Sequence, residues 1–211
     1  MDVAAPHRAI SAGLDGDVLV LLAGSKKAMS GREIAQRLGL RSHDGVRKAL
    51  DRLTRQGIVD RDGSRNAYLH QLNRDHLGAP AVLALADMRT RLWTRMREAV
   101  AAWEPAPVHV AVFGSAARGD GDDESDIDVL VVRPLDTSQE DVQWVEQVEG
   151  FRASVESWTG NRASIVELAE QNLADLLARG QPPAVLRAVL DDGIDVAGVP
   201  ARRLLGGLNG P

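Results

Sequence analysis

Two aspartates alternate with apolar residues in the segment Asp126-Ile-Asp-Val-Leu-Val-Val132. A period of two residues is typical of a β-strand, because successive side chains point to opposite faces. Asp126 and Asp128 therefore share one face of a predicted strand over 125–132, with Cα atoms about 6.5–7 Å apart. Two carboxylates on a core strand repel each other and lose hydration, and a divalent cation between them relieves both costs. The alternation predicts a strand whose paired carboxylates hold a metal ion.

An upstream predicted strand, Val108–Phe113, runs directly into Gly114-Ser-Ala-Ala-Arg118. A chain that breaks at glycine and begins a helical turn presents free backbone N–H groups to an anion. Ser115 adds a hydroxyl donor, and Arg118 adds a guanidinium suited to phosphate. We therefore expect Gly114, Ser115 and Arg118 to bind the phosphates of a nucleotide. We expect the two aspartates to bind Mg²⁺, with Mn²⁺ as the alternative ion.

Gly114-Ser115, ten residues and then Asp126-x-Asp128 resemble the Gly-Ser-x10-Asp-x-Asp signature of the polymerase-β-like nucleotidyltransferase superfamily. The wording is closest to that of the minimal nucleotidyltransferases often found in toxin–antitoxin pairs. The resemblance implies a mixed sheet with flanking helices that binds an NTP, first of all ATP, as its Mg²⁺ complex. It implies transfer of a nucleoside monophosphate to a hydroxyl of a macromolecule, with a partner protein as the first expectation, through two metal ions.

The resemblance also implies a third acidic residue, on a later strand, that binds the catalytic metal. The later predicted strand is Arg162–Leu168, whose only acid is Glu167, whereas the family phrase places Ser164 at the position of the acid. These residues are three apart, so a regular strand directs only one of them to the aspartates. If it is Glu167, the domain is an active enzyme with Asp126, Asp128 and Glu167 as its catalytic residues. If it is Ser164, the domain binds NTP and Mg²⁺ without efficient turnover.

The first part of the chain differs in charge from the second. Residues 1–78 carry a net charge of +4 and residues 79–211 carry −9, within a total of −5. A basic first part and an acidic second part indicate two units with different partners.

Helical spacing in the basic part predicts three helices, over 15–24, 30–39 and 42–55, of which the second begins with the capping box Ser30-Gly-Arg-Glu33 and the third is capped by Ser42. Two strands, 58–61 and 66–72, follow around a turn at Asp62-Gly63. This order resembles a winged helix-turn-helix DNA-binding domain. The resemblance implies a third helix in the major groove, with a wing beside it, and these DNA contacts: Arg47, Lys48 and Arg52 from the helix, and Arg61 and Arg65 from the wing.

We expect an α+β chain of five segments: a tail (1–12), a winged helix-turn-helix domain (13–75), a linking helix (76–105), a minimal nucleotidyltransferase domain (106–200) and a second tail (201–211). One continuous helix is predicted over 80–103. The absence of cysteine excludes a disulfide framework, and no apolar run is long enough to span a bilayer, so we expect a cytoplasmic protein without a membrane partner.

Three functions remain open at this point. The first is a Mg²⁺-dependent nucleotidyltransferase with a DNA-binding winged helix. The alternative is a transcriptional regulator that senses nucleotides through an inactive nucleotidyltransferase domain. The third is a scaffold in which both parts bind proteins, and a homodimer is compatible with each.

Overall fold

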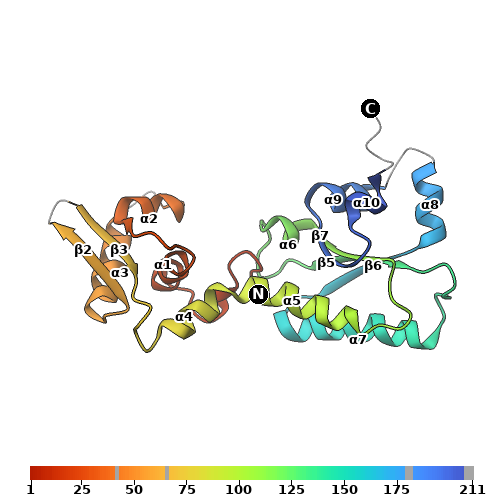
Figure 1. Ribbon diagram of the computed structural model, residues 1–211, viewed down its shortest axis with the longest axis horizontal. Coiled ribbons are helices and arrows are strands. Elements are labelled where there is room, and N and C mark those ends of the chain that lie inside the picture. Colours follow the sequence, from red (N-terminus) through yellow and green to blue (C-terminus); the bar gives the residue numbers. More distant parts are fainter. Residues whose placement is uncertain (41–42, 65–66, 179–182, 207–211) are drawn as a thin grey trace. The chain divides into compact units, whose positions relative to one another are not determined.

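The computed structural model describes residues 1–40, 43–64, 67–178 and 183–206 (Figure 1). The chain forms two compact units. Residues 5–89 make up the N-terminal unit, and residues 1–4 together with 90–211 make up the C-terminal unit. The backbone therefore passes from one unit to the other twice, after Ala4 and after Arg89.

The N-terminal unit is a winged helix. Its antiparallel sheet has the strand order β1-β3-β2. The elements, in chain order, are η1 (Pro6–Ala9), α1 (Leu14–Ala23), β1 (Met29–Ser30), α2 (Gly31–Arg37), α3 (His43–Arg55), β2 (Val59–Ser64), β3 (Ala67–Leu72) and α4 (Ala79–Ala86).

The three predicted helices of this unit are confirmed, and their apolar faces form one core. Buried side chains of α1, α2, α3, the sheet and α4 meet in it, among them Leu22, Ile34, Leu50, Val59 and Val82. The Ser30 half of the predicted capping box is present, since the Glu33 N–H donates to Ser30 Oγ at 3.2 Å. The Glu33 carboxylate accepts from Arg37 at 2.9 Å. The Ser42 cap lies outside the described residues.

The predicted turn at Asp62-Gly63 is wrong. Asp62 pairs with Leu69 and Gly63 pairs with Tyr68, so both residues belong to β2. Gly63 adopts φ 108°, a backbone conformation that would be strained in a residue with a side chain. Its N–H donates to Asp62 Oδ1 at 2.7 Å. The glycine and aspartate that indicated a turn are here used within the strand, and pairing continues to Ser64.

The helix predicted over 80–103 is two helices, α4 and α5 (Met88–Ala101), separated at Asp87. Each serves a different core: Val82 packs in the N-terminal unit, whereas Met96 packs in the C-terminal unit. A single apolar stripe in the sequence therefore concealed a boundary between two cores.

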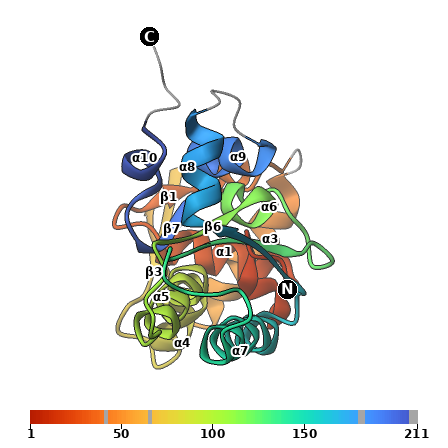
Figure 2. The same ribbon diagram turned by 90° about the vertical axis from the view of Figure 1, so that its right-hand side faces the viewer.

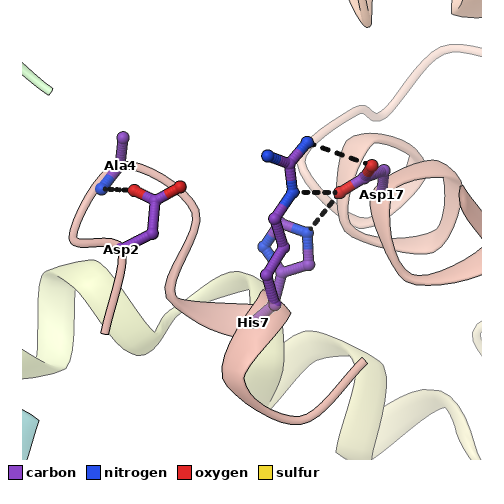
Figure 3. Close-up of polar contacts among 5 residues, drawn as sticks. Asp2, Ala4, His7 and Asp17 are labelled. Carbon is purple, nitrogen blue, oxygen red and sulfur yellow. Dashed lines mark hydrogen bonds and ion pairs between the residues drawn. The ribbon is translucent and has the colours of Figure 1, made fainter. Parts of the chain in front are cut away.

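The first residues of the chain, expected to be a tail, are folded. Pro6 and His7 of η1 are buried. His7 Nε2 lies 2.8 Å from Asp17 Oδ1, and Arg8 binds both carboxylate oxygens of Asp17 at 3.0 and 3.1 Å (Figure 3). Burial acts to raise the pKa of Asp17, but the hydrogen bonds from Arg8 and His7 outweigh it and hold this pKa below its usual value. These contacts fix η1 to α1.

The C-terminal unit contains the predicted mixed sheet. Its strand order is β6-β5-β4-β7, with β4 antiparallel to both neighbours and β5 parallel to β6. After α5 the elements are β4 (His109–Phe113), α6 (Gly114–Arg118), β5 (Ile127–Arg133), α7 (Val142–Thr159), β6 (Ala163–Ala169), α8 (Glu170–Ala178), α9 (Ala184–Asp192), β7 (Ile194–Gly198) and α10 (Ala201–Leu204).

Helices cover both faces of this sheet (Figure 2). On one face, Val129 and its neighbours of like orientation pack against α5 and α7, where Trp103 contacts Trp144 and Phe151 edge-on. On the other face, Leu130 packs against α8, α9 and α10. The expected tail 201–211 therefore contains α10 and the fully buried Leu205, whose side chain completes the second core; residues 207–211 lie outside the described part.

His109, fully buried in β4, makes the stability of the C-terminal unit depend on pH. Burial lowers the pKa of His109, and the hydrogen bond to the Val199 carbonyl and the charge of Asp195 offset only part of this effect. Below about pH 6.5 the unfolded chain binds a proton that the folded protein does not, so stability falls on acidification, by at most about 1.4 kcal/mol per pH unit from one group. Denaturant unfolding at a series of pH values should show that the free energy of unfolding of the wild type falls on acidification. The fall should be smaller in His109→Gln, and an equal fall in the two proteins would contradict this prediction.

Candidate functional site

The predicted cradle, Gly114, Ser115 and Arg118, forms where β4 ends and α6 begins. Gly114 has φ 70°, and a Cβ there would lie 2.6 Å from Asp128 Oδ2. Only glycine fits here, because the main chain must adopt a left-handed conformation and also approach a carboxylate closely. The cradle backbone and the Asp128 carboxylate are thus brought together.

Asp128 lies near the start of the central strand β5, opposite Phe113 at the end of β4 and Ser164 near the start of β6. Burial and then the charge of Asp126 raise the pKa of Asp128, and the Ser164 hydroxyl and Arg118 offset only part of this rise. Asp126 is the exposed last residue of the loop before β5, rather than a residue of the strand. The charge of Asp126 thus disfavours the ionised form of Asp128, and a divalent cation beside the two carboxylates would relieve this repulsion.

The donor set fits one Mg²⁺ ion. Mg²⁺ keeps several waters and binds through one or two carboxylates together with substrate phosphates. Asp126 and Asp128 would supply the carboxylates and the cradle would hold the phosphates. In the described ranges of the chain, no group of three or more metal-ligating side chains is present.

Ser164, and not Glu167, faces the carboxylate pair. The parallel register places Ser164 beside Asp128 and Glu167 beside Val131, on the opposite face of the sheet. There Arg133 Nε donates to Glu167 Oε1 at 2.7 Å, and Arg133 also donates to the Thr137 carbonyl. The expectation that Glu167 is a catalytic residue is therefore contradicted, because the regular alternation of β6 turns it away from the site.

Arg118 is tied to acidic neighbours. Its Nε donates to Asp120 Oδ2 at 2.9 Å, and its Nη1 lies 3.9 Å from Asp192. Its charge also reaches Asp128, since both groups shift each other's pKa. Because Arg118 is partly exposed, these ion pairs are weak enough for a phosphate to replace them.

The predicted DNA-binding cations of α3 are exposed but paired. Arg47 lies 2.7 Å from Asp44 and 3.5 Å from Asp51. Lys48 also pairs with Asp44, and Arg52 pairs with Asp15 on α1. Arg65 lies outside the described residues.

Arg47 lines a cavity of about 730 Å³ between α2, α3 and the wing, which we call the wing cavity. Its other polar residues, chiefly Arg32, His43, Tyr68 and His70, were not predicted as site residues. Arg61, expected as a wing contact, lines the cavity too. Arg61 stacks over the Tyr68 ring at 4.5 Å. Burial lowers the pKa of His70, and its Nδ1 has no hydrogen-bond partner among the residues that the structure covers.

Comparison with known proteins identifies both units. Residues 91–179 match the family of the nucleotidyltransferase domain, and residues 25–66 match the family of the LexA DNA binding domain. A crystal structure of a toxin–antitoxin with AMP-PNP is similar at 15% identity and a TM-score of 0.37, over 55% of this chain and 82% of that chain. A search of the curated proteins finds no match.

Within the described ranges, no helix combines the length and apolar character that a membrane span requires. The two family matches lie in the two units, in the order that the sequence motifs predicted. The chain therefore joins a winged helix domain of the LexA DNA-binding type to a nucleotidyltransferase domain.

Proposed function

We propose that this chain is a DNA-binding regulator whose nucleotidyltransferase domain binds an NTP, first of all ATP, as its Mg²⁺ complex. The observation that carries the proposal is the close approach of Gly114 to the Asp128 carboxylate, since a Cβ at Gly114 would lie 2.6 Å from Asp128 Oδ2. This approach supports a site in which the cradle and the carboxylate would bind one ligand. When bound, Mg²⁺ would neutralise the phosphate oxygens and the carboxylate pair.

Each residue of the site has a defined task in this proposal. The backbone of Gly114 and the hydroxyl of Ser115 would donate to phosphate oxygens, and Arg118 would exchange Asp120 for phosphate. Asp126 and Asp128 would hold the metal. The Ser164 hydroxyl, beside Asp128 in the sheet, would favour the charged form of that carboxylate.

The domain is proposed to bind rather than to transfer because of Ser164. A neutral hydroxyl stands where a third carboxylate would complete a two-metal set, and a two-metal mechanism needs ligands for both ions. The second candidate function is transfer of a nucleoside monophosphate to a macromolecular hydroxyl, first of all on a partner protein. The complete pair of Asp126 and Asp128 favours this alternative.

The N-terminal unit is proposed to bind DNA through α3 and the wing cavity. Arg32, Arg47 and Arg61 lie at the cavity and can donate to phosphates, whereas Arg52 is held by Asp15. The match of residues 25–66 to the LexA DNA binding domain supports this assignment.

Asp128→Asn should abolish Mg²⁺-dependent nucleotide binding, because it removes a metal ligand while keeping the side-chain shape. Isothermal titration of ATP with Mg²⁺ should show at least a 100-fold weaker Kd, since even outer-shell partners contribute about 10–100-fold. Chelation of the metal should weaken the wild type in the same way. Glu124→Gln removes an exposed carboxylate from the adjacent loop and should leave the Kd unchanged; equal binding by Asp128→Asn would refute the site.

Ser164→Asp should convert binding into turnover, because it places a third carboxylate beside Asp128. Pyrophosphate release from ATP with Mg²⁺, with the AMP passing to water or to a hydroxyl of the protein, should rise by about 10-fold or more in this variant. Ser164→Ala and Glu167→Gln should remain at the wild-type level. Rapid release by the wild type that falls in Glu167→Gln would instead establish the transferase with Glu167 as its third acid.

Arg47→Ala should weaken binding to duplex DNA and reduce the slope of log K against log salt by about 1, because one phosphate contact is lost. Arg52→Ala, on the side of α3 that pairs with Asp15, serves as the matched control and should retain the slope. Fluorescence anisotropy measures the DNA affinity of each variant as a function of salt.

Mg²⁺–ATP should shift the DNA affinity of the wild type but not of Asp128→Asn, and an identical response of the two proteins would exclude nucleotide sensing at this site.

A further inference from the structure

The loop over 119–126 joins α6 to β5 and ends at Asp126. It is rich in acidic residues, whose negative charges repel one another. Hydrogen bonds within the loop and from other parts of the chain oppose this repulsion. Asp122 stabilises part of it by accepting from Ser125 Oγ at 2.7 Å and from the Glu124 N–H at 3.1 Å. Gly121 lies so close to Ser115 that a Cβ would be 2.9 Å from Ser115 Oγ. The loop therefore connects the cradle to the metal carboxylates.

Asn161 holds this loop from the side of β6. Its Nδ2 donates to the Ser125 carbonyl at 2.9 Å and to the Asp123 carbonyl at 3.3 Å. The residue is 4% exposed, so these bonds are shielded from water. A neutral amide can hold carbonyls next to a cluster of carboxylates without adding charge to it. Asn161 thus fixes the backbone immediately before Asp126.

The opposite end of the same amide binds the start of the chain. Asn161 Oδ1 accepts from the nitrogen of Met1 at 2.7 Å. Val3 is 5% exposed and lies in the core between the sheet and the helices α5 and α7. Asp2 Oδ1 accepts from the Ala4 N–H at 2.8 Å, which orders the turn that follows (Figure 3). Residues 1–4 are therefore a folded part of the C-terminal unit, and we call them the N-terminal strap.

We propose that Asn161 is a positioning residue that sets the metal ligand Asp126 and makes its placement depend on the N-terminal strap. This inference rests on the proposed binding of a Mg²⁺–NTP complex. Both carbonyls that accept from Asn161 lie within three residues of Asp126, whereas its hydrogen bonds within the described part of the chain go to this loop, to Met1 and to Thr159, and not to the cradle. We call the hydrogen bonds of Asn161 to Met1, Asp123 and Ser125 the clamp. Because the clamp acts on the backbone before Asp126, it should govern the affinity for the metal and leave the affinity of the cradle for phosphates unchanged.

The decisive experiment separates these two affinities in the full-length protein. Titration of Mg²⁺ at a fixed ATP concentration should show that Asn161→Ala raises the half-saturating Mg²⁺ concentration by about 10-fold, the lower range for loss of an outer-shell partner. The affinity for ATP in the presence of chelator should stay within about 2-fold, because the cradle is untouched. Asn161→Asp keeps the acceptor for Met1 but loses both donors, and it should behave like Asn161→Ala.

A matched control is available at the same corner of the fold. Glu156 Oε1 accepts from the Ala163 N–H at 3.2 Å, so Glu156→Ala removes a hydrogen bond at the start of β6 without touching the loop. It should leave the Mg²⁺ requirement unchanged. Val3→Asp should expel the strap and raise the Mg²⁺ requirement. Combining it with Asn161→Ala should add less than the sum of the two effects, because the Met1 nitrogen binds Asn161 Oδ1 at 2.7 Å and makes only a longer direct contact, of 3.5 Å, with the Asp123 carbonyl.

Each remaining outcome decides the matter. If Asn161→Ala weakens ATP binding equally with and without Mg²⁺, the residue serves only general stability and the inference is overturned. An unchanged Mg²⁺ requirement in Asn161→Ala, with a wild type that binds Mg²⁺–ATP, overturns the inference alone. A wild type that binds no nucleotide overturns the proposed function. Hydrogen exchange of the backbone amides of 119–126 in the free protein then tests the clamp. Faster exchange in Asn161→Ala than in Glu156→Ala supports the clamp, and equal rates oppose it.

Discussion

The close approach of the Gly114 backbone to the Asp128 carboxylate is the constraint around which the C-terminal unit is organised. It requires β4 to end in a left-handed residue without a side chain, and it requires β5 to pair with β4 so that Asp128 lies opposite Phe113. The sheet supplies both conditions, because the apolar residues on either side of β5 pack against helices on its two faces. The position of the site therefore follows from the pairing of two buried strands. Burial in this position disfavours the ionised form of Asp128.

The same strand pairing explains why the two halves of the site differ in completeness. Antiparallel pairing with β4 supplies the cradle, and parallel pairing with β6 supplies the residue on the other side of Asp128. Because that residue is Ser164, the site has a hydrogen-bond donor where a further negative charge would stand. Ser164 favours the ionised form of Asp128 and so offsets part of the rise that burial causes in the pKa of that carboxyl. Glu167 is engaged instead with Arg133, where it orders the connection between β5 and α7.

Local sequence signals predicted the parts of the structure that depend on neighbours along the chain. The spacing from Gly114 to Asp128, the apolar stripes of α1, α2 and α3 and the Ser30 cap all belong to this kind. The choice between Ser164 and Glu167 depends on the register between β5 and β6, which no local pattern encodes. The break at Asp87 was hidden for a similar reason: α4 is apolar throughout, α5 continues its apolar stripe, and only the cores that the two helices enter distinguish them. Asn161 follows a helix-ending glycine and looks like an ordinary turn residue in sequence, because its partners are distant in the chain.

The two passages of the backbone between units have a consequence for topology. Residues 5–89 lie between the first four residues and the remainder of the C-terminal unit, so the winged helix domain is an insertion in the sequence of the nucleotidyltransferase unit. A fragment that starts at residue 90 would leave the place of Val3 vacant in its core and Asn161 without its partner Met1. Neither part can be excised with a single cut, and dissection of this protein calls for a circular permutant that rejoins the first residues to the domain they complete.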